Sequence, residues 1–221
     1  MHTCRPDYLS ALLAQLPEML SRVHRWTHFP SLPATERETV LEHSYISVLL
    51  TSAMLALEEA HGLHKGKMDH GKVVLAAALH DIGEGRIGDV RYAVKQDPRV
   101  REHLEAIERE QVEHMLCDLP EAARVVFWDA YELVNSNTLE GRFFEAVERI
   151  GYVQYAVPHV QRGRMEFLEV FRMQHEKILA LEPEFVSAKI IYDAYREYVA
   201  EQIRLEKAAE AVRFLAGARL E

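Results

Sequence analysis

Residues 76–90 form the stretch AAALHDIGEGRIGDV, in which an apolar helix gives way to a polar loop with three glycines. His80 and Asp81 stand side by side at the junction, and Glu84 and Asp89 follow shortly after. Burying a charge is costly unless a partner compensates it. Ionisable groups at the end of a buried helix therefore indicate a site that neutralises them, and a bound cation would do so.

Helical periodicity continues along nearly the whole chain, whereas the alternation typical of strands is almost absent. Pro30 and Pro33 break the pattern and predict an extended connector between the first two helices. Thr35, with Glu38 three residues later, has the form of a capping box that would begin the second helix. The sequence predicts an all-α chain with helices at residues 7–24, 36–60, 72–82, 99–117, 121–135, 139–157, 163–181 and 184–216.

The composition is that of an ordinary soluble domain, with 221 residues, 48% hydrophobic and 28% charged. We expect one domain over residues 1–221. A net charge of −9 disfavours binding to a nucleic acid polymer, which usually needs a basic surface. Cys4 and Cys117 form no CxxC pair, which predicts a reducing compartment. No signal peptide is visible and no apolar stretch approaches the roughly 18 residues of a membrane span, so we expect a cytoplasmic protein.

Four side chains are candidate metal ligands. His43 lies in the most apolar helix, where a buried imidazole needs partners; a core histidine bonded to the backbone is the plain alternative. Imidazole and carboxylate at His80 and Asp81 suit a divalent ion such as Zn²⁺, Mn²⁺, Co²⁺ or Fe²⁺ if they converge in a cleft. Glu148 interrupts an apolar stripe, so it either binds a cation or forms an interhelical salt bridge.

The glycine loop and the end of the first helix add further candidates. Glu84 could orient or deprotonate a water molecule at the metal. The loop glycines at positions 83, 85 and 88 would let the backbone approach a ligand closely, although plain turn chemistry is the alternative. Arg25 offers bidentate recognition of phosphate and Trp26 a flat face for a sugar or base, with packing at a helix end as the alternative.

Taken in order, these groups resemble the motif set of the HD-domain metal-dependent phosphohydrolases. The matches are Arg25-Trp26, Glu42-His43-Ser44, His80-Asp81-Ile82-Gly83-Glu84, Gly88-Asp89 and Lys95. The chain is most similar to the bacterial HD-domain 5′-deoxynucleotidases and their eukaryotic relatives. The resemblance covers about residues 10–157 and implies an all-helical HD bundle, followed by a C-terminal helical extension over about residues 158–221.

The resemblance also implies a function and roles for individual residues. The chain would be a 5′-(deoxy)nucleotidase that releases phosphate from nucleoside monophosphates, acts on no nucleic acid polymer, and forms a homodimer. One divalent ion (Co, Mn, Zn, Fe or Mg) would be held by His43, His80, Asp81 and Glu148. Glu84 and Asp89 would be catalytic, and the substrate would be bound by Arg25, Trp26, Asp89 and Lys95. Where the family has a final Asp ligand this chain has Glu148, whose extra methylene requires the helix to sit back or the carboxylate to bind differently.

Several alternatives stay open. A triphosphohydrolase acting on dNTPs would use the same metal centre. Guanosine tetraphosphate hydrolases carry HDxxED, but position 85 is Gly, and cyclic-dinucleotide phosphodiesterases carry HDIGK, but Glu84 follows Gly83. A di-iron oxygenase needs additional histidines, and a degenerate HD module would bind a nucleotide or a partner through helices 163–216. The histidines available for a second iron are His61, His64, His70, His103 and His114.

Overall fold

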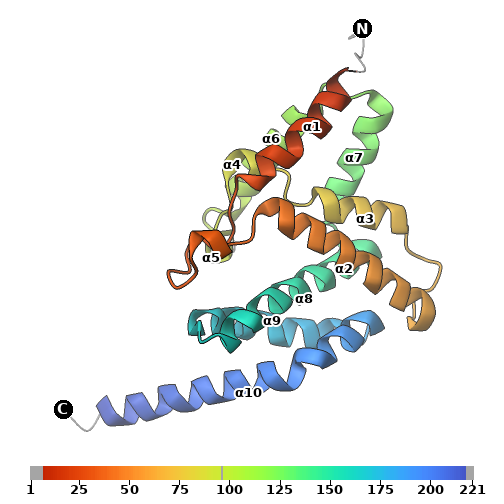
Figure 1. Cartoon of the computed structure of the whole chain (residues 1–221). Helices are drawn as coiled ribbons and strands as arrows, with labels where there is room; N and C mark the ends of the chain where they lie inside the picture. Colours follow the sequence, from red (N-terminus) through yellow and green to blue (C-terminus); the bar gives the residue numbers. More distant parts are fainter. Residues whose placement is uncertain (1–6, 96, 218–221) are drawn as a thin grey trace. The chain divides into compact units, whose positions relative to one another are not determined.

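The computed structural model of the chain describes residues 7–95 and 97–217. The elements are α1 (Asp7–Ser21), η1 (Ala34–Glu36), α2 (Val40–His61), α3 (His70–Leu79), α4 (Glu84–Ile87), α5 (Tyr92–Lys95), α6 (Arg101–Leu116), α7 (Glu121–Leu133), α8 (Leu139–Gln161), η2 (Met165–Phe167), α9 (Leu168–Leu181) and α10 (Val186–Gly217) (Figure 1). Within the described residues the only extended pairing is an isolated bridge between His24 and Thr39. The all-α prediction is confirmed.

The start of α2 differs from the prediction because the capping box is formed by other residues. The backbone N–H and the hydroxyl of Thr39 donate to Glu42 Oε2 at 2.7 and 2.9 Å, and the Glu42 N–H donates back to Thr39 Oγ1 at 3.2 Å. This arrangement satisfies donors at the helix start that have no partner inside the helix. Thr35 instead lies in η1, so the predicted Thr35–Glu38 box is wrong, and the Glu38 side chain serves elsewhere.

By internal packing the chain divides into two compact units. The first comprises Met1–Ala53 and Lys67–Glu145, and there α3 packs on α7 while α6 packs on α4, α5 and α7. The second comprises Met54–Gly66 and Ala146–Glu221, and there α9 packs along α10. Its core includes the fully buried Phe171, Phe185 and Tyr192. α2 and α8 are each continuous helices that contribute residues to both units. A single domain over the whole chain stays a prediction.

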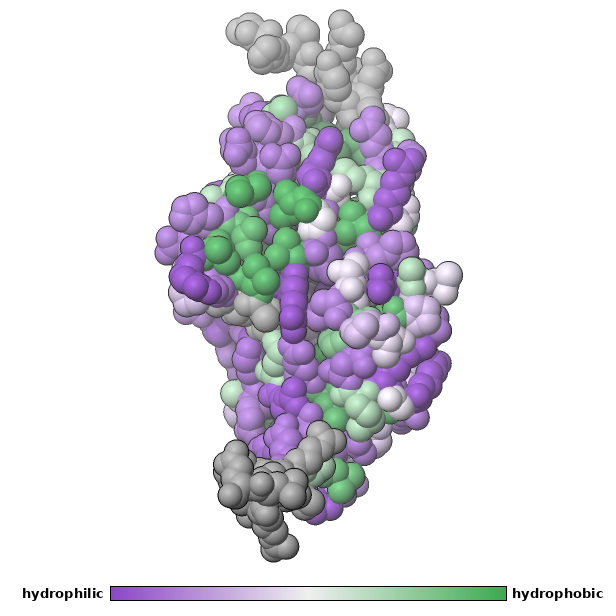
Figure 2. Space-filling view, turned by 90° about the vertical axis from the view of Figure 1, so that its left-hand side faces the viewer, coloured by the Kyte–Doolittle hydropathy of each residue, from purple (hydrophilic) through white to green (hydrophobic). Residues whose placement is uncertain are grey.

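α2 is long and apolar enough to cross a membrane when only length and composition are considered. This corrects the expectation that no stretch approaches that length. The finding is weak evidence, because the core helix of a soluble protein passes the same test. α2 also buries polar side chains, among them Ser47, Thr51 and Glu58. The face of the molecule drawn in Figure 2 is largely hydrophilic, and its largest hydrophobic area lies in the upper left part.

Candidate metal centre and active site

A short backbone pairing fixes the residues that follow α1 beside the start of α2. The Arg25 N–H donates to the Glu38 carbonyl at 2.8 Å, and the Val40 N–H donates to the Val23 carbonyl at 2.9 Å. Trp26, next in the chain, has a φ of 62°, a left-handed conformation that is rare for a bulky residue and typically costs about 1–3 kcal/mol. The fold thus holds this segment in a strained conformation next to Glu38.

His80 and Asp81 lie in the turn that follows α3. α3 ends at Leu79, and the chain turns before α4 begins at Glu84. Adjacent residues on a helix point about 100° apart. In this turn Asp81 Oδ2 lies 3.2 Å from His80 Nε2, so an imidazole and a carboxylate present their ligand atoms to the same point.

Three ligand atoms form a compact triangle. The Nε2 atoms of His43 and His80 are 3.1 Å apart, and Asp81 Oδ2 lies 3.6 Å from His43 Nε2. A divalent ion with bonds of about 2.1 Å to nitrogen and oxygen places neighbouring ligand atoms about 3.0–3.4 Å apart. Both histidines are buried, at 5% and 6% exposed. The spacing and the donor types therefore fit a divalent ion.

The remaining ring nitrogens indicate where the protons of the two imidazoles are. His80 Nδ1 lies 2.9 Å from the Ala77 carbonyl, which accepts hydrogen bonds and cannot donate, so this nitrogen carries a proton. His43 Nδ1 faces Glu38 Oε1 at 3.5 Å, which favours a proton there too. In the neutral rings both Nε2 atoms then present lone pairs to each other, and a proton or a metal ion between them relieves the repulsion.

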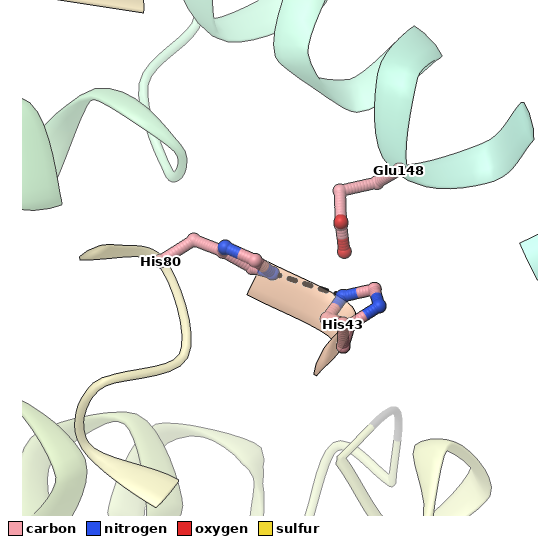
Figure 3. A group of neighbouring side chains, drawn as sticks. All are labelled: His43, His80 and Glu148. Carbon is pink, nitrogen blue, oxygen red and sulfur yellow. Dashed lines mark hydrogen bonds between the residues drawn. The ribbon is translucent and has the colours of Figure 1, made fainter. Parts of the chain in front are cut away.

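Glu148, on α8, belongs to a group of three side chains that could hold a metal ion. The Phe144 ring packs edge-on against His80, with centroids 5.3 Å apart, and Glu148 follows four residues later on the same helix face. One ligand atom from each of His43, His80 and Glu148 lies within 4.8 Å of the others (Figure 3). Asp81 is not a member of this group, and metal ligation by each of the four predicted residues stays a prediction.

Arg25 is buried against the ligand triangle. Its Nη1 donates to Asp81 Oδ2 at 2.5 Å, and the residue is 6% exposed. Burial alone would raise the pKa of Asp81, but the charges of His80, Arg25 and His43 hold it well below its usual range. Asp81 is therefore ionised at neutral pH, as a metal ligand must be.

Glu84 is almost completely buried, at 1% exposed, and accepts a hydrogen bond from Lys95 Nζ through Oε1. Its Oε2 is buried and has no hydrogen-bond partner among the described residues. Burial and the charge of Asp81 raise the pKa of Glu84 to about 7, although Lys95 acts in the opposite direction. A carboxyl group with that pKa accepts and releases a proton near neutral pH.

Comparison with known proteins places the chain in a family. The model of the family described as 5′-deoxynucleotidase YfbR-like matches residues 12–195. The chain belongs to the YfbR-like 5′-deoxynucleotidase family. It has the HD-domain helical fold, and its membership of this family indicates that the chain is a metal-dependent phosphohydrolase. No curated protein is significantly similar to the chain.

Solved structures agree with the HD-domain fold. An HD-domain phosphohydrolase from Listeria innocua is 19% identical, with 93% of this chain and 98% of that chain covered and a TM-score of 0.71. A predicted metal-dependent phosphohydrolase from Magnetospirillum magnetotacticum is 19% identical over 91% and 96%, with a TM-score of 0.61. A conserved hypothetical protein from Pyrococcus furiosus is 24% identical over 88% and 99%, with a TM-score of 0.59. At these identities the likeness shows the fold alone.

Other predicted residues of this HD-domain chain have mixed outcomes. Asp89 is half-buried between α4 and α5, where its charge helps to raise the pKa of Glu84. Trp26 is 8% exposed and donates through Nε1 to Glu38 Oε2 at 3.1 Å, so its role in substrate binding stays a prediction. Among the described residues, the group that could hold a metal includes none of the histidines considered for a second iron. Those histidines are His61, His64, His70, His103 and His114.

Two loop glycines lie in close packing contacts, and their expected approach to a ligand stays a prediction. A Cβ atom at Gly83 would lie 2.4 Å from Glu108 Cγ, and one at Gly85 would lie 2.6 Å from Met19 Cε. The absence of side chains at these positions lets α4 pack against α6 and α1, which fixes the turn that carries His80.

Glu38 is the functional candidate that the sequence did not reveal. Its carboxylate lies beside three side chains of the site, the indole of Trp26, the imidazole of His43 and the guanidinium of Arg25. Burial alone would raise the pKa of Glu38, but these neighbours, His43 foremost, lower it. The position depends on the pairing of the segments on either side of the connector, which no local pattern encodes.

Proposed function

We propose that this chain is a metal-dependent 5′-nucleotidase that removes phosphate from nucleoside or deoxynucleoside monophosphates. The observation that carries the proposal is the buried triangle of His43 Nε2, His80 Nε2 and Asp81 Oδ2, with sides of 3.1, 3.2 and 3.6 Å. A buried arginine and a buried carboxyl group of raised pKa accompany it, which are the groups that phosphate-ester hydrolysis needs.

His43, His80, Asp81 and Glu148 would hold one divalent ion. When bound, such an ion supplies Lewis acidity toward a phosphoryl oxygen and toward water. Asp81 and Glu148 bring negative charge to this set and the two imidazoles bring neutral nitrogens, so the site carries less negative charge than an all-carboxylate one. That balance favours Mn²⁺, Co²⁺, Fe²⁺ or Zn²⁺ over Mg²⁺, which prefers oxygen ligands.

Arg25 would bind the phosphate of the substrate. A guanidinium matches two phosphate oxygens and stays charged at every physiological pH. Because Arg25 Nη1 is only 2.5 Å from Asp81 Oδ2, a phosphate held by this side chain lies next to the proposed ligands. The positive charge also stabilises the charge that develops on the equatorial oxygens during phosphoryl transfer.

Glu84 would take the proton from the attacking water. With a pKa of about 7 the carboxyl group is ionised in about half of the molecules at neutral pH, and it binds the abstracted proton well. Lys95 holds Oε1 and keeps the buried carboxylate in one orientation. In this proposal Lys95 acts through Glu84, Asp89 selects between ribose and deoxyribose, and Trp26 packs on the sugar.

The proposal is tested with the full-length chain stripped by a chelator and reloaded with Mn²⁺ or Co²⁺. A panel of nucleoside monophosphates and triphosphates is assayed for the released product. We expect metal-dependent release of orthophosphate from monophosphates, lost in His80→Ala and Asp81→Ala and retained in His103→Ala, a surface control. Release that needs no metal, or that survives His80→Ala, would contradict the mechanism.

The same panel separates the alternatives. A dNTP triphosphohydrolase releases tripolyphosphate and nucleoside, and the monophosphates are then left intact. A catalytically degenerate module binds a nucleotide but releases no product with any metal. The substitution of Glu148 for the family's Asp is the feature that favours this last alternative.

We also propose that the chain acts in the cytoplasm as a homodimer and on small nucleotides, not on a nucleic acid polymer. The net charge of −9 supports the small substrate, because it repels a phosphate backbone while a local arginine still attracts one phosphate. Sedimentation of the purified chain measures the oligomeric state directly.

A further inference from the structure

We propose that Glu38 is a positioning residue that holds His43 as an Nε2 ligand and couples it to Arg25 and Trp26. The inference rests on the metal site of the proposed function. Glu38 is not one of the proposed metal ligands and does not contact a reacting atom. Its effect therefore acts through the side chains that it contacts.

The two oxygens of Glu38 face different parts of the site. Oε1 lies 3.5 Å from His43 Nδ1, on the side of the ring opposite to the ligand triangle. Oε2 accepts the indole N–H of Trp26 at 3.1 Å and lies 3.8 Å from Arg25 Nε. One carboxylate, whose side chain is 10% exposed, thus lies between a proposed metal ligand and the proposed phosphate-binding arginine.

A carboxylate behind a ligating imidazole has two effects. It fixes the proton on Nδ1, so that Nε2 keeps its lone pair for the metal, and it makes the ring a stronger donor. The distance of 3.5 Å is longer than the roughly 2.7–3.2 Å of a formed hydrogen bond. Such bonds are often long in a site without ligand and tighten when the site is loaded.

His80 provides an internal comparison. The Nδ1–H of His80 donates to the neutral backbone carbonyl of Ala77 at 2.9 Å. This hydrogen bond fixes the Nδ1–H tautomer of His80 and does not involve Glu38. Loss of the Glu38 charge should therefore change the state of His43 and leave that of His80 unchanged. A general loosening of the fold would disturb both rings.

Glu38→Gln is the test variant because it keeps the size of the side chain and an oxygen acceptor for Trp26 while it removes the charge. Glu42→Gln is the matched control on the same segment, since glutamine also completes a capping box. Glu38→Asp keeps the charge on a shorter side chain. Binding of Mn²⁺ and Co²⁺ is measured by calorimetry, and histidine tautomers are followed by nitrogen-15 NMR without metal.

We expect Glu38→Gln to weaken metal binding by about 10–100-fold, the usual effect of losing such a partner. The His43 ring should shift from the Nδ1–H toward the Nε2–H tautomer while His80 does not change. Glu38→Asp should bind metal more tightly than Glu38→Gln, and Glu42→Gln should behave as the parent chain does.

The inference is overturned if folded Glu38→Gln binds metal as tightly as the parent chain or leaves the His43 tautomer unchanged. It is also overturned if Glu42→Gln weakens binding equally. These outcomes differ from failure of the proposed function, which is a parent chain that binds no metal or releases no phosphate.

Discussion

His43 and His80 face each other through their Nε2 atoms at 3.1 Å, while the Nδ1 atom of each ring is turned toward an acceptor, Glu38 Oε1 or the Ala77 carbonyl. In this arrangement the two Nε2 atoms can share one proton or bind one metal ion. A proton and a metal ion therefore compete for the same lone pairs.

Metal binding should release protons. We expect this release because a proton held between the two Nε2 atoms must leave before the metal binds. Calorimetry in buffers of different ionisation enthalpy measures this number. His43→Ala should remove most of the release, whereas His103→Ala, on the surface of α6, should not. Metal binding without any release of protons would contradict the arrangement.

Lys95→Met should move the acidic limb of the pH–activity profile to higher pH. Glu84 has a pKa raised to about 7 by burial, and the Lys95 charge opposes that rise. Loss of the charge raises the pKa further, so less of the ionised base is present at any pH below the plateau. The kcat/KM of the variant should fall more at about pH 6 than at about pH 8. Lys65→Met, at an exposed position, is the control, and an unshifted limb would exclude Glu84 as the base.

Local patterns predict most of this fold, because apolar periodicity is a property of neighbouring residues. The error at the start of α2 has a specific cause, since Thr35-x-x-Glu38 and Thr39-x-x-Glu42 stand one after the other in the sequence. Both satisfy the spacing of a capping box. The apolar run begins directly after Thr39, which is the feature that selects the second box.

The candidate site was predictable to the extent that its residues interrupt apolar segments. His43, His80 and Glu148 do so, and they come together in the structure. Glu38 does not, because it lies in a polar connector, and its contacts with Arg25 and Trp26 depend on the backbone pairing of the two segments. A contact made by two segments across a connector is tertiary, and no periodicity records it.

Thr39→Ala should destabilise the chain by about 0.5–2 kcal/mol, the usual cost of losing an N-cap side chain. The hydroxyl of Thr39 accepts the Glu42 N–H at 3.2 Å, and this bond has no replacement in alanine. Urea unfolding measures the free energy of unfolding. Thr35→Ala, in exposed η1, is the matched control and should change stability by less than about 0.5 kcal/mol. Equal losses in the two variants would contradict the observed cap.

Glu148→Gln should reduce the thermal stabilisation that Mn²⁺ gives to the chain. A ligand at about 100 times its Kd stabilises the folded state by about 2.7 kcal/mol, which corresponds to about 5–10 °C in Tm for a chain of this size. Glutamine is a weaker, uncharged ligand, so the Mn²⁺-dependent rise in Tm should shrink while the Tm in chelator stays close to that of the parent.

Two further variants serve as comparisons for the Mn²⁺-dependent rise in Tm of Glu148→Gln. Glu145→Gln removes an exposed carboxylate from the same helix, three residues earlier, and should keep the full Mn²⁺-dependent rise. Glu148→Asp restores the residue type of the family and should bind the ion if α8 can approach by the length of one methylene group. A full rise in Glu148→Gln would mean that Glu148 is a structural carboxylate and that two histidines and Asp81 hold the ion alone.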